Sequence, residues 1–298
     1  MDFVHTYRAQ LMARRDLMLC DLAAHDGVPA AVVDNADVRV VPSYAYRGSE
    51  QFDENQISVL LVGEPVRILE RQIGWYRVRA YNVAGWVRRD KLALGAWPDP
   101  FLGEGATVVE DSIFLNGRRL TMGARLPLSP AGEVLLPRRL PNGELTVERC
   151  RLPGGMVRGF LPPEPQQAVA QARRLLGNRY GWGGLYGQRD CSSLLCDVMK
   201  TLGVCLPRDA AYQARIPGRV LARDQIVPGA MLWMPGHAML CSGGRGESAR
   251  VIHALGTCLD EQGERWEANR VVETSLMLRR ASTGQRFLDA LTSIRLIF

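Results

Sequence analysis

The sequence contains no apolar run that approaches the roughly 20 residues of a membrane-spanning helix. The segment from Met1 to Arg15 also lacks the apolar core of a secretory leader. There are seven cysteines, an odd number without the spacing of a disulfide framework, which fits a reducing compartment. These absences predict a cytoplasmic protein without a membrane span, or a protein of the cell envelope or periplasm if a leader has been removed.

No dense basic run is present either, although the net charge is +6. The arginines are scattered and interleaved with acidic residues, so we expect no dedicated nucleic-acid surface. A mildly positive surface would favour anionic substrates. With 298 residues, of which 47% are hydrophobic, the chain can bury two or three small cores.

Histidine is scarce, and so are candidates for a general base: the chain has only His5, His25, His237 and His253. The last two lie in strand-like segments on either side of a glycine-rich stretch, residues 242–248, which is typical of a hairpin loop. If the hairpin is centred on Arg245, opposed residue numbers sum to 490 and His237 faces His253. Their Cβ atoms would then be about 4.5–5.5 Å apart. We therefore expect one imidazole to orient the other.

Cys191 follows the glycine-rich turn Tyr180-Gly181-Trp182-Gly183-Gly184 and begins a segment with a helical apolar stripe. A cysteine at a helix start is close to unpaired N–H groups and to the positive end of the helix dipole. Both favour the thiolate, which predicts a pKa below the free value of about 8.5. The glycines would let a substrate approach the backbone near the sulfur. With His237 and His253, Cys191 would complete a nucleophile–base–orienter arrangement.

Two alternative interpretations of these residues compete with this hypothesis. A cysteine on an apolar helix or a histidine in a strand is usually a packing residue, and we expect this of Cys20, Cys150, Cys196, Cys205, Cys241 and Cys258. A zinc site at His237 and Cys241, or at His253 and Cys258, is the second alternative. On a strand, four steps of about 3.3 Å separate the first pair by about 13 Å, too far for zinc–ligand bonds of about 2.0–2.3 Å. We expect no metal and no organic cofactor.

Upstream, short strand patterns predict small barrels. Strands are expected at residues 38–40, 57–62, 65–70, 75–79 and 85–87. A second all-β segment contains a predicted hairpin that joins residues 134–136 to 145–148. The pattern divides the chain into an N-terminal helical segment (1–35), a small barrel (36–97), a degenerate second barrel (98–158) and a C-terminal domain (159–298).

The glycine-rich turn and the following Asp190-Cys191-Ser192-Ser193-Leu194 resemble the core motif of the NlpC-type papain-like cell-wall cysteine endopeptidases. The similarity covers about residues 160–298 and continues through residues 203–209, Gln213, 227–233, 237–240 and 252–254. Residues 74–78 and 85–87 are similar to bacterial SH3 domains of cell-wall enzymes. The resemblance implies an α+β fold, in which a helix bearing the nucleophile packs on an antiparallel sheet.

The resemblance also implies roles. Cys191 would be the nucleophile, His237 the base and His253 the residue that orients the base, while Asp190 and Ser192 would help to hold the substrate. The chain departs from the family at Ala230, where an acidic residue is frequent, and in residues 209–213, which lack a serine that many relatives carry. The three catalytic positions are intact.

Relatives with an SH3-like barrel resemble γ-D-glutamyl-L-diamino acid endopeptidases, which act on peptidoglycan stem peptides or muropeptides that present a free L-Ala amine. Asp190 and Tyr81 are candidates to bind this amine, and Tyr44, Tyr46 and Glu50 are weaker ones. The diamino acid, diaminopimelate or lysine, is left open. So is the oligomeric state, although we expect a monomer. An amidase or acyltransferase with another substrate, or a non-catalytic cell-wall binding protein, are the alternative functions.

Overall fold

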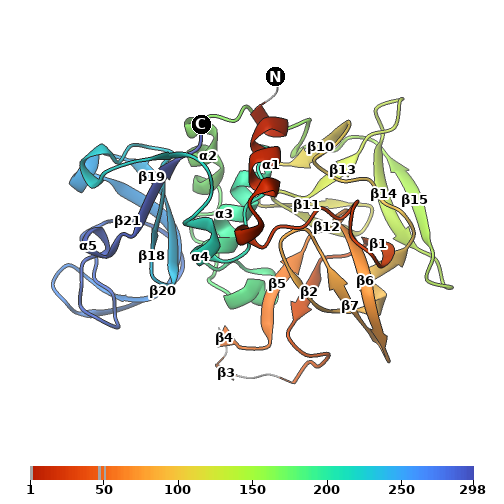
Figure 1. Ribbon diagram of the computed structural model, residues 1–298, viewed down its shortest axis with the longest axis horizontal. Helices are drawn as coiled ribbons and strands as arrows, with labels where there is room; N and C mark the ends of the chain where they lie inside the picture. Colours follow the sequence, from red (N-terminus) through yellow and green to blue (C-terminus); the bar gives the residue numbers. More distant parts are fainter. Residues whose placement is uncertain (1–2, 46–47, 50–51) are drawn as a thin grey trace. The chain divides into compact units, whose positions relative to one another are not determined.

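The computed structural model describes residues 3–45, 48–49 and 52–298, which form two compact units (Figure 1). The mixed unit comprises the chain up to Leu17 together with Pro162–Gly181 and Gln188–Phe298. The β unit comprises Met18–Leu161 and Trp182–Gly187. No helix in the described part of the chain is both long and apolar enough to cross a membrane.

The first half of the β unit is an antiparallel sheet with the strand order β5-β2-β8-β7-β6-β1-β9. Its strands, with the short β3–β4 ribbon and one 3-10 turn, are β1 (Val28–Val32), β2 (Ala36–Arg39), β3 (Gly48–Ser49), β4 (Phe52–Asp53), β5 (Gln56–Leu60), β6 (Pro65–Gln72), β7 (Trp75–Arg79), β8 (Ala84–Arg88), η2 (Arg89–Lys91) and β9 (Leu92–Leu94). Val66 and Ile68 on β6 are buried while Arg67 between them is not, as expected for a strand with one face on a core.

This barrel contains the strands predicted from the sequence, and β7 has the predicted bounds. Strand β1 was not predicted, because residues 28–32 lie in the range expected to be a helical segment. Ala30, Ala31 and Val32 are fully buried, and β1 pairs with both β6 and β9. The run is short and apolar without alternation, so its sequence pattern alone does not distinguish a strand from a buried helical turn.

The second half of the β unit has its own core, formed around Val108, Leu120, Leu126 and Leu136. Its strands are β10 (Gly105–Val108), β11 (Ser112–Leu115), β12 (Arg118–Thr121), β13 (Arg125–Pro127), β14 (Val134–Arg139), β15 (Leu145–Cys150) and β16 (Met156–Arg158). They pair as β13-β10-β16, β11-β12 and β14-β15. The predicted hairpin is confirmed, with Val134 opposite Cys150 and Arg139 opposite Leu145.

Arg125 stabilises this second half by donating to backbone carbonyl oxygens near its two ends. Its guanidinium donates to the carbonyl oxygens of Pro100 (2.5 Å), Gly103 (3.2 Å) and Gly159 (2.6 Å), and it lies 4.0 Å from the centre of the Phe160 ring. Burial lowers the pKa of Arg125 to about 10. The Arg125 guanidinium thus links residues 100–103, at the start of the second half, to Gly159 at its end.

We expect Arg125→Leu to lower the free energy of unfolding by about 2–3 kcal/mol, because it removes charged donors to the partly buried carbonyl oxygens of Pro100 and Gly159. Chemical denaturation followed by tryptophan fluorescence measures the effect. Arg151→Leu is the matched control, since Arg151 is exposed in the same unit. Equal stability of the two variants would contradict the role assigned to Arg125.

The glycine-rich turn belongs in part to the β unit. Residues Trp182–Gly187 (η3) pack on β5, and both Gly183 and Gly184 have positive φ angles, 62° and 84°. A Cβ at Gly183 would lie 2.3 Å from the Gln56 carbonyl oxygen, and one at Gly184 would lie 2.5 Å from Val59. These two glycines therefore allow the η3 backbone to pack closely on β5. The expectation that they open the backbone to substrate is wrong.

The mixed unit is built on one antiparallel sheet with the order β17-β22-β18-β19-β20-β21. Its elements are α1 (Phe3–Ala13), η1 (Arg15–Leu17), α2 (Pro165–Arg173), α3 (Cys191–Lys200), α4 (Ala210–Gln213), β17 (Arg219–Val220), η4 (Arg223–Gln225), β18 (Met231–Met234), β19 (His237–Gly243), η5 (Gly246–Ser248), β20 (Arg250–Leu259), β21 (Arg265–Ser275), α5 (Phe287–Ala290) and β22 (Ser293–Leu296). Helix α1 folds with this unit, since the Tyr7 hydroxyl donates to the carbonyl oxygen of Pro217 at 2.7 Å.

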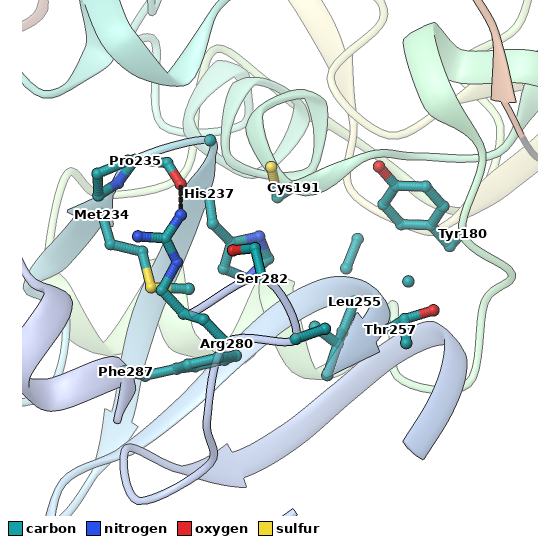
Figure 2. Close-up of a pocket in the computed structure, with 14 residues that line it drawn as sticks. Tyr180, Cys191, Met234, Pro235, His237, Leu255, Thr257, Arg280, Ser282 and Phe287 are labelled. Atoms are coloured by element: carbon teal, nitrogen blue, oxygen red, sulfur yellow. Dashed lines mark hydrogen bonds between the residues drawn. The ribbon is translucent and has the colours of Figure 1, made fainter. Parts of the chain in front are cut away.

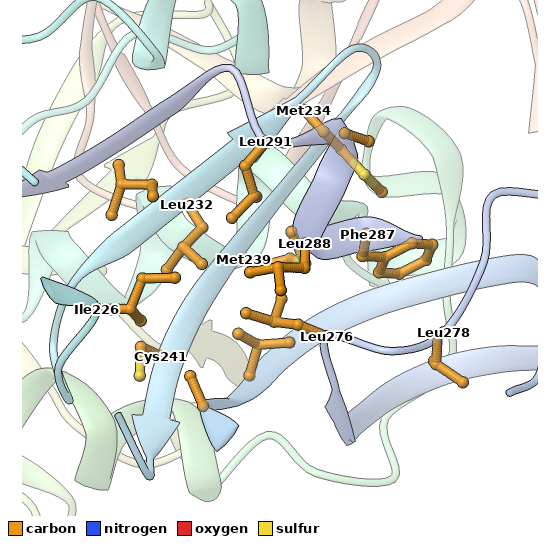
Figure 3. Packing of buried hydrophobic residues seen from close by; sticks show 14 of the residues in the cluster. Ile226, Leu232, Met234, Met239, Cys241, Leu276, Leu278, Phe287, Leu288 and Leu291 are labelled. Carbon is orange, nitrogen blue, oxygen red and sulfur yellow. The ribbon is translucent and has the colours of Figure 1, made fainter. Parts of the chain in front are cut away.

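Helix α3 packs against β19 and β20, and its predicted stripe of Leu194, Leu195 and Val198 is fully buried. A core of Leu232, Met239, Phe287, Leu288 and their neighbours surrounds the same strands (Figure 3). A helix on an antiparallel sheet is the α+β arrangement expected for a papain-like domain, and this prediction is confirmed. The arrangement places the first residue of α3 beside the first residues of β19.

Candidate active site

Cys191 is the first residue of α3, and Asp190 is the N-cap of that helix. The Asp190 carboxylate accepts a hydrogen bond from the Ser193 backbone N–H (2.8 Å), while the Ser193 hydroxyl accepts one from the Asp190 N–H (2.9 Å). This reciprocal capping box fixes the start of the helix. The thiol is therefore held at one place by the backbone that precedes and follows it.

The predicted depression of the thiol pKa is wrong. Burial, together with the negative charge of Asp190, raises the pKa of Cys191 to about 12. Backbone hydrogen bonds from Ala238 and Ser192 and the charge of Arg208 act in the opposite direction but do not offset the loss of hydration. The resting side chain is thus a neutral thiol, and the contact with Ala238 places it next to the residue that follows His237.

His237, His253 and Thr274 form a chain of hydrogen bonds. His237 Nε2 lies 2.7 Å from His253 Nδ1, and His253 Nε2 lies 2.9 Å from the Thr274 hydroxyl. When His237 Nε2 and His253 Nε2 carry the hydrogens, each donates to the next group in the chain. His237 Nδ1 is then unprotonated and free to act as a base. Thr274, on β21, was not predicted, because only the pairing of β20 with β21 places it beside His253.

The two histidines meet in a different register from the one predicted. Leu240 lies opposite Ile252 and Cys241 opposite Val251, so opposed residue numbers sum to 492 rather than 490. A bulge between Cys241 and Gly243 and the 3-10 turn Gly246–Ser248 shift the hairpin. The shift is even, and it therefore leaves both histidines on the same face of the sheet. They are diagonal neighbours, which long side chains can still bridge.

The imidazoles are held neutral by their surroundings. Burial, with a further contribution from the positive charge of Arg280, lowers the pKa of His237 to about 4. Burial and the neighbouring His237 lower the pKa of His253 well below its usual value. The resting site therefore combines a neutral thiol with a neutral base, and the thiolate has to form by proton transfer from Cys191 to His237.

This state predicts a broad pH profile for kcat/KM. In the active form, Cys191 and His237 share a single proton. His237 gains a second one only near its pKa of about 4, and Cys191 loses the shared proton to solvent only near its pKa of about 12. We expect kcat/KM to be constant from about pH 5.5 to about pH 7, below the titration of a free amino terminus on the substrate at about pH 7.7–8.0, and to fall tenfold per unit below pH 4. Steady-state hydrolysis at constant ionic strength measures it. An acid limb near the ordinary histidine pKa of about 6.5 would contradict a neutral His237.

Cys191 and His237 line one cavity of about 320 Å³ (Figure 2). Its remaining wall consists of Tyr180, Met234, Pro235, Gly236, Ala254, Leu255, Gly256, Thr257, Arg280, Ala281, Ser282 and Phe287. His253 lies behind His237 and is fully buried, as expected of a residue that orients the base. Among the residues that the structure describes, no aspartate or glutamate belongs to this wall, and Arg280, which was not predicted, supplies its positive charge.

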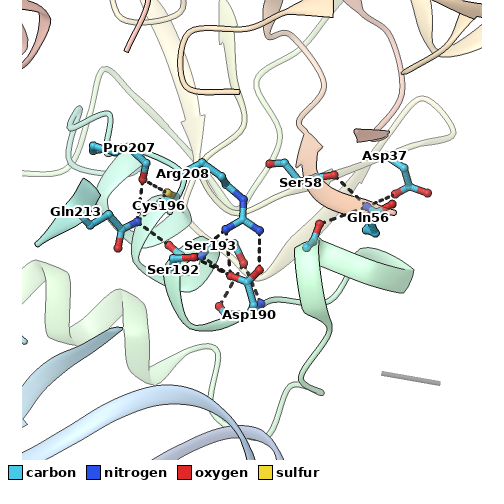
Figure 4. Close-up of polar contacts among 11 residues, drawn as sticks. Asp37, Gln56, Ser58, Asp190, Ser192, Ser193, Cys196, Pro207, Arg208 and Gln213 are labelled. Carbon is cyan, nitrogen blue, oxygen red and sulfur yellow. Dashed lines mark hydrogen bonds and ion pairs between the residues drawn. The ribbon is translucent and has the colours of Figure 1, made fainter. Parts of the chain in front are cut away.

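Asp190 and Ser192 belong to a buried network around Arg208 (Figure 4). Arg208 donates to both Asp190 carboxylate oxygens, at 3.2 and 2.6 Å, and to the Ser192 hydroxyl at 2.8 Å. Burial opposes ionisation of Asp190, but the Arg208 charge and the hydrogen bonds from Arg208 and Ser193 leave its pKa below the ordinary value. A substrate ammonium would have to share oxygens that already accept hydrogen bonds, so substrate binding by this pair stays a prediction.

The other predicted residues lie in the β unit. Tyr81 is buried, its hydroxyl accepts a hydrogen bond from the Asn82 side chain at 3.3 Å, and its ring contacts Phe101. Tyr44 is exposed and packs on Trp75. Tyr46 and Glu50 lie outside the described residues. The role of Tyr81 in binding the amine stays a prediction.

Comparison with known proteins agrees with this geometry. Residues 177–263 match the model of the NlpC/P60 family, and residues 47–93 match that of the bacterial SH3 domain. No curated protein is significantly similar to the chain in sequence.

Solved structures of similar fold include two NlpC/P60 proteins. The structure of an NlpC/P60 endopeptidase from Photobacterium damselae subsp. piscicida has a TM-score of 0.75 at 18% identity, covering 99% of this chain and 78% of that one. An NlpC/P60 family protein from Bacillus cereus has a TM-score of 0.64 at 16% identity, covering 90% of this chain and 98% of that one. The chain therefore contains a segment that matches the NlpC/P60 family model, preceded by one that matches the bacterial SH3 domain model, in a fold shared with solved NlpC/P60 proteins.

Proposed function

We propose that the protein is a cysteine endopeptidase that hydrolyses the γ-D-glutamyl–L-diamino acid amide of peptidoglycan stem peptides or muropeptides and requires a free N-terminal L-Ala. The observation that carries the enzymatic part is the cavity in which Cys191 and His237 both lie, with His253 bonded to the far nitrogen of His237. The substrate part is supported by the combination of an SH3 domain with an NlpC/P60 domain and by a cavity wall without carboxylates.

The reaction begins with transfer of the Cys191 proton to Nδ1 of His237. The thiolate attacks the γ-carbonyl carbon, and the oxyanion accepts hydrogen bonds from backbone N–H groups at the start of α3. The imidazolium then protonates the leaving amine as the C–N bond breaks, which produces a thioester to the γ-carboxyl of D-Glu. His237 next removes a proton from water. The hydroxide attacks the thioester carbonyl, L-Ala-γ-D-Glu is released, and the thiolate recovers its proton from His237.

His253 and Thr274 assist without touching the substrate. His237 Nε2–H donates to His253 Nδ1 and His253 Nε2–H donates to the Thr274 hydroxyl, which keeps the His237 ring in the tautomer whose Nδ1 faces the cavity, both before and after it becomes charged. A neutral histidine takes the place that a carboxylate occupies in other triads. It therefore orients the base while adding little to its basicity, which agrees with the low pKa of His237.

Mass spectrometry of digests of defined peptides tests the proposal. L-Ala-γ-D-Glu-diaminopimelate should yield L-Ala-γ-D-Glu and diaminopimelate, and acetylation of the L-Ala amine should reduce kcat/KM by about 10²-fold or more. Indifference to acetylation would favour an amidase or acyltransferase of the same fold. A non-catalytic binding protein would be favoured by two results together: no peptide is cleaved, and iodoacetamide labels Cys191 no faster than the buried Cys196.

A further inference from the structure

We propose that Arg280 is a specificity residue that binds a carboxylate on the leaving component of the substrate. This inference rests on the proposed function and names the chemistry that the diamino acid must present. The carboxylate could be the α-carboxylate of a C-terminal diamino acid or the second carboxylate of diaminopimelate, and both have the same chemistry toward a guanidinium.

Arg280 is held at the cavity by its own backbone and by the turn before β19. Its N–H donates to the carbonyl oxygen of Gln285 (2.9 Å), and its carbonyl oxygen accepts from Gly284 (2.8 Å). Its guanidinium donates to the carbonyl oxygen of Pro235 at 3.2 Å (Figure 2). Pro235 and Gly236 directly precede His237, so this hydrogen bond fixes the cation beside the base.

The guanidinium is not neutralised by the protein. No carboxylate in the part of the chain that the structure describes forms an ion pair with Arg280. Other arginines of the mixed unit are paired, for example Arg208 with Asp190 and Arg286 with Asp289. An arginine has five N–H donors, and the bond to Pro235 uses one. The half-buried cation thus offers a bidentate site to an incoming carboxylate.

The position of Arg280 determines which part of the substrate it meets. The His237 imidazolium has to protonate the leaving amine, so the leaving component must lie on the His237 side of the scissile bond. Figure 2 shows Arg280, Pro235 and Met234 on that side of the cavity, whereas Tyr180 lies on the opposite side of Cys191. The guanidinium therefore faces the diamino acid and not the L-Ala-γ-D-Glu portion.

Kinetics of Arg280→Gln on four tripeptides tests the inference. The peptides are L-Ala-γ-D-Glu with either diaminopimelate or lysine as the third residue, each with a free or an amidated α-carboxyl. Amidated lysine has no carboxylate on the leaving component. We expect Arg280→Gln to raise KM about tenfold or more for peptides that carry the recognised carboxylate, with a smaller change in kcat, and to leave amidated lysine unaffected. Arg280→Lys should recover part of the loss because it keeps the charge.

The four substrates separate the two sources of the carboxylate. Loss confined to the two diaminopimelate peptides identifies its second carboxylate, and loss confined to the two free acids identifies the α-carboxylate. Arg279→Gln is the control variant, since its guanidinium donates to the carbonyl oxygen of Gly284 and it is not part of the cavity wall.

Two results would overturn the inference while leaving the proposed function intact: no change for any peptide, or an equal loss for all four, amidated lysine included. If the unchanged enzyme cleaves none of the four peptides, the proposed function fails, and the inference fails with it.

Discussion

The Cys191→Ala variant is expected to lose at least about 10⁴-fold in kcat for hydrolysis of the stem tripeptide, because no other group can form the thioester. The side chain shrinks by one buried atom, and the capping box that begins α3 is made by Asp190 and Ser193, not by the thiol. The variant should therefore fold, bind substrate and fail in the chemical step alone. Product formation by mass spectrometry and unfolding by fluorescence measure the two parts.

Cys196→Ala is the matched control. Cys196 is buried on the same helix, and burial raises its pKa to about 12 as it does for Cys191, but its thiol donates to the carbonyl oxygen of Pro207 and lies outside the cavity wall. Its loss should affect stability and leave kcat nearly unchanged. Substantial turnover by Cys191→Ala, or equal loss in both variants, would remove Cys191 from the role of nucleophile.

The second large effect is expected on stability. Arg208→Leu should lower the free energy of unfolding by about 3–5 kcal/mol at neutral pH, because it leaves the buried Asp190 carboxylate without its counter-charge. The same change removes the donor to Ser192 and loosens the backbone on both sides of Cys191. Denaturant unfolding at fixed temperature measures the difference from the unchanged protein.

The effect should depend on pH in a defined direction. In the unchanged protein the pKa of Asp190 is below its unfolded value, so the stability it contributes is complete above that value and is lost as the pH falls through the folded pKa. In Arg208→Leu the burial of Asp190, which is the largest influence on its pKa, is opposed by the hydrogen bonds from Ser193 and no longer by the arginine, so its pKa rises and the protonated form is favoured in the folded state. The penalty is therefore largest near pH 7 and shrinks toward pH 4 and below.

Two further variants complete this test. Asp190→Asn combined with Arg208→Leu removes both charges and should recover part of the loss. Arg215→Leu breaks an exposed ion pair with Asp16, 3.9 Å long, in the same unit and should change stability little. A double variant as unstable as Arg208→Leu would show that packing of the arginine, and not its charge, is what matters.

Local patterns in the sequence predicted the parts of this fold that depend on near neighbours. The stripe of α3, the strands of the SH3 domain and the turn of β14 with β15 each follow from residues a few positions apart. The His237 and His253 strands were predicted for the same reason. Their register was not, because it depends on how many residues the bulge and the 3-10 turn absorb in the loop. The two histidines still meet because the register is shifted by an even number of residues, which keeps both side chains on the same face of the sheet.

The features that the sequence did not predict arise over long distances. Arg208 reaches Asp190 from 18 positions away, and Thr274 meets His253 only because β21 pairs with β20. The pKa of Cys191 depends on burial by the sheet, and position in a helix alone suggested the opposite sign. The glycines at 183 and 184 face Gln56 and Val59, more than a hundred residues earlier.

Neither compact unit corresponds to a continuous stretch of chain. Tyr7 on helix α1 bonds to Pro217, so the helix has to wait for more than two hundred further residues to be synthesised before it can dock. The β unit is likewise incomplete until Trp182–Gly187, which packs on β5, has been synthesised. Nascent chains of this protein therefore carry uncovered surface late into translation, which makes early release or stalling a route to aggregation.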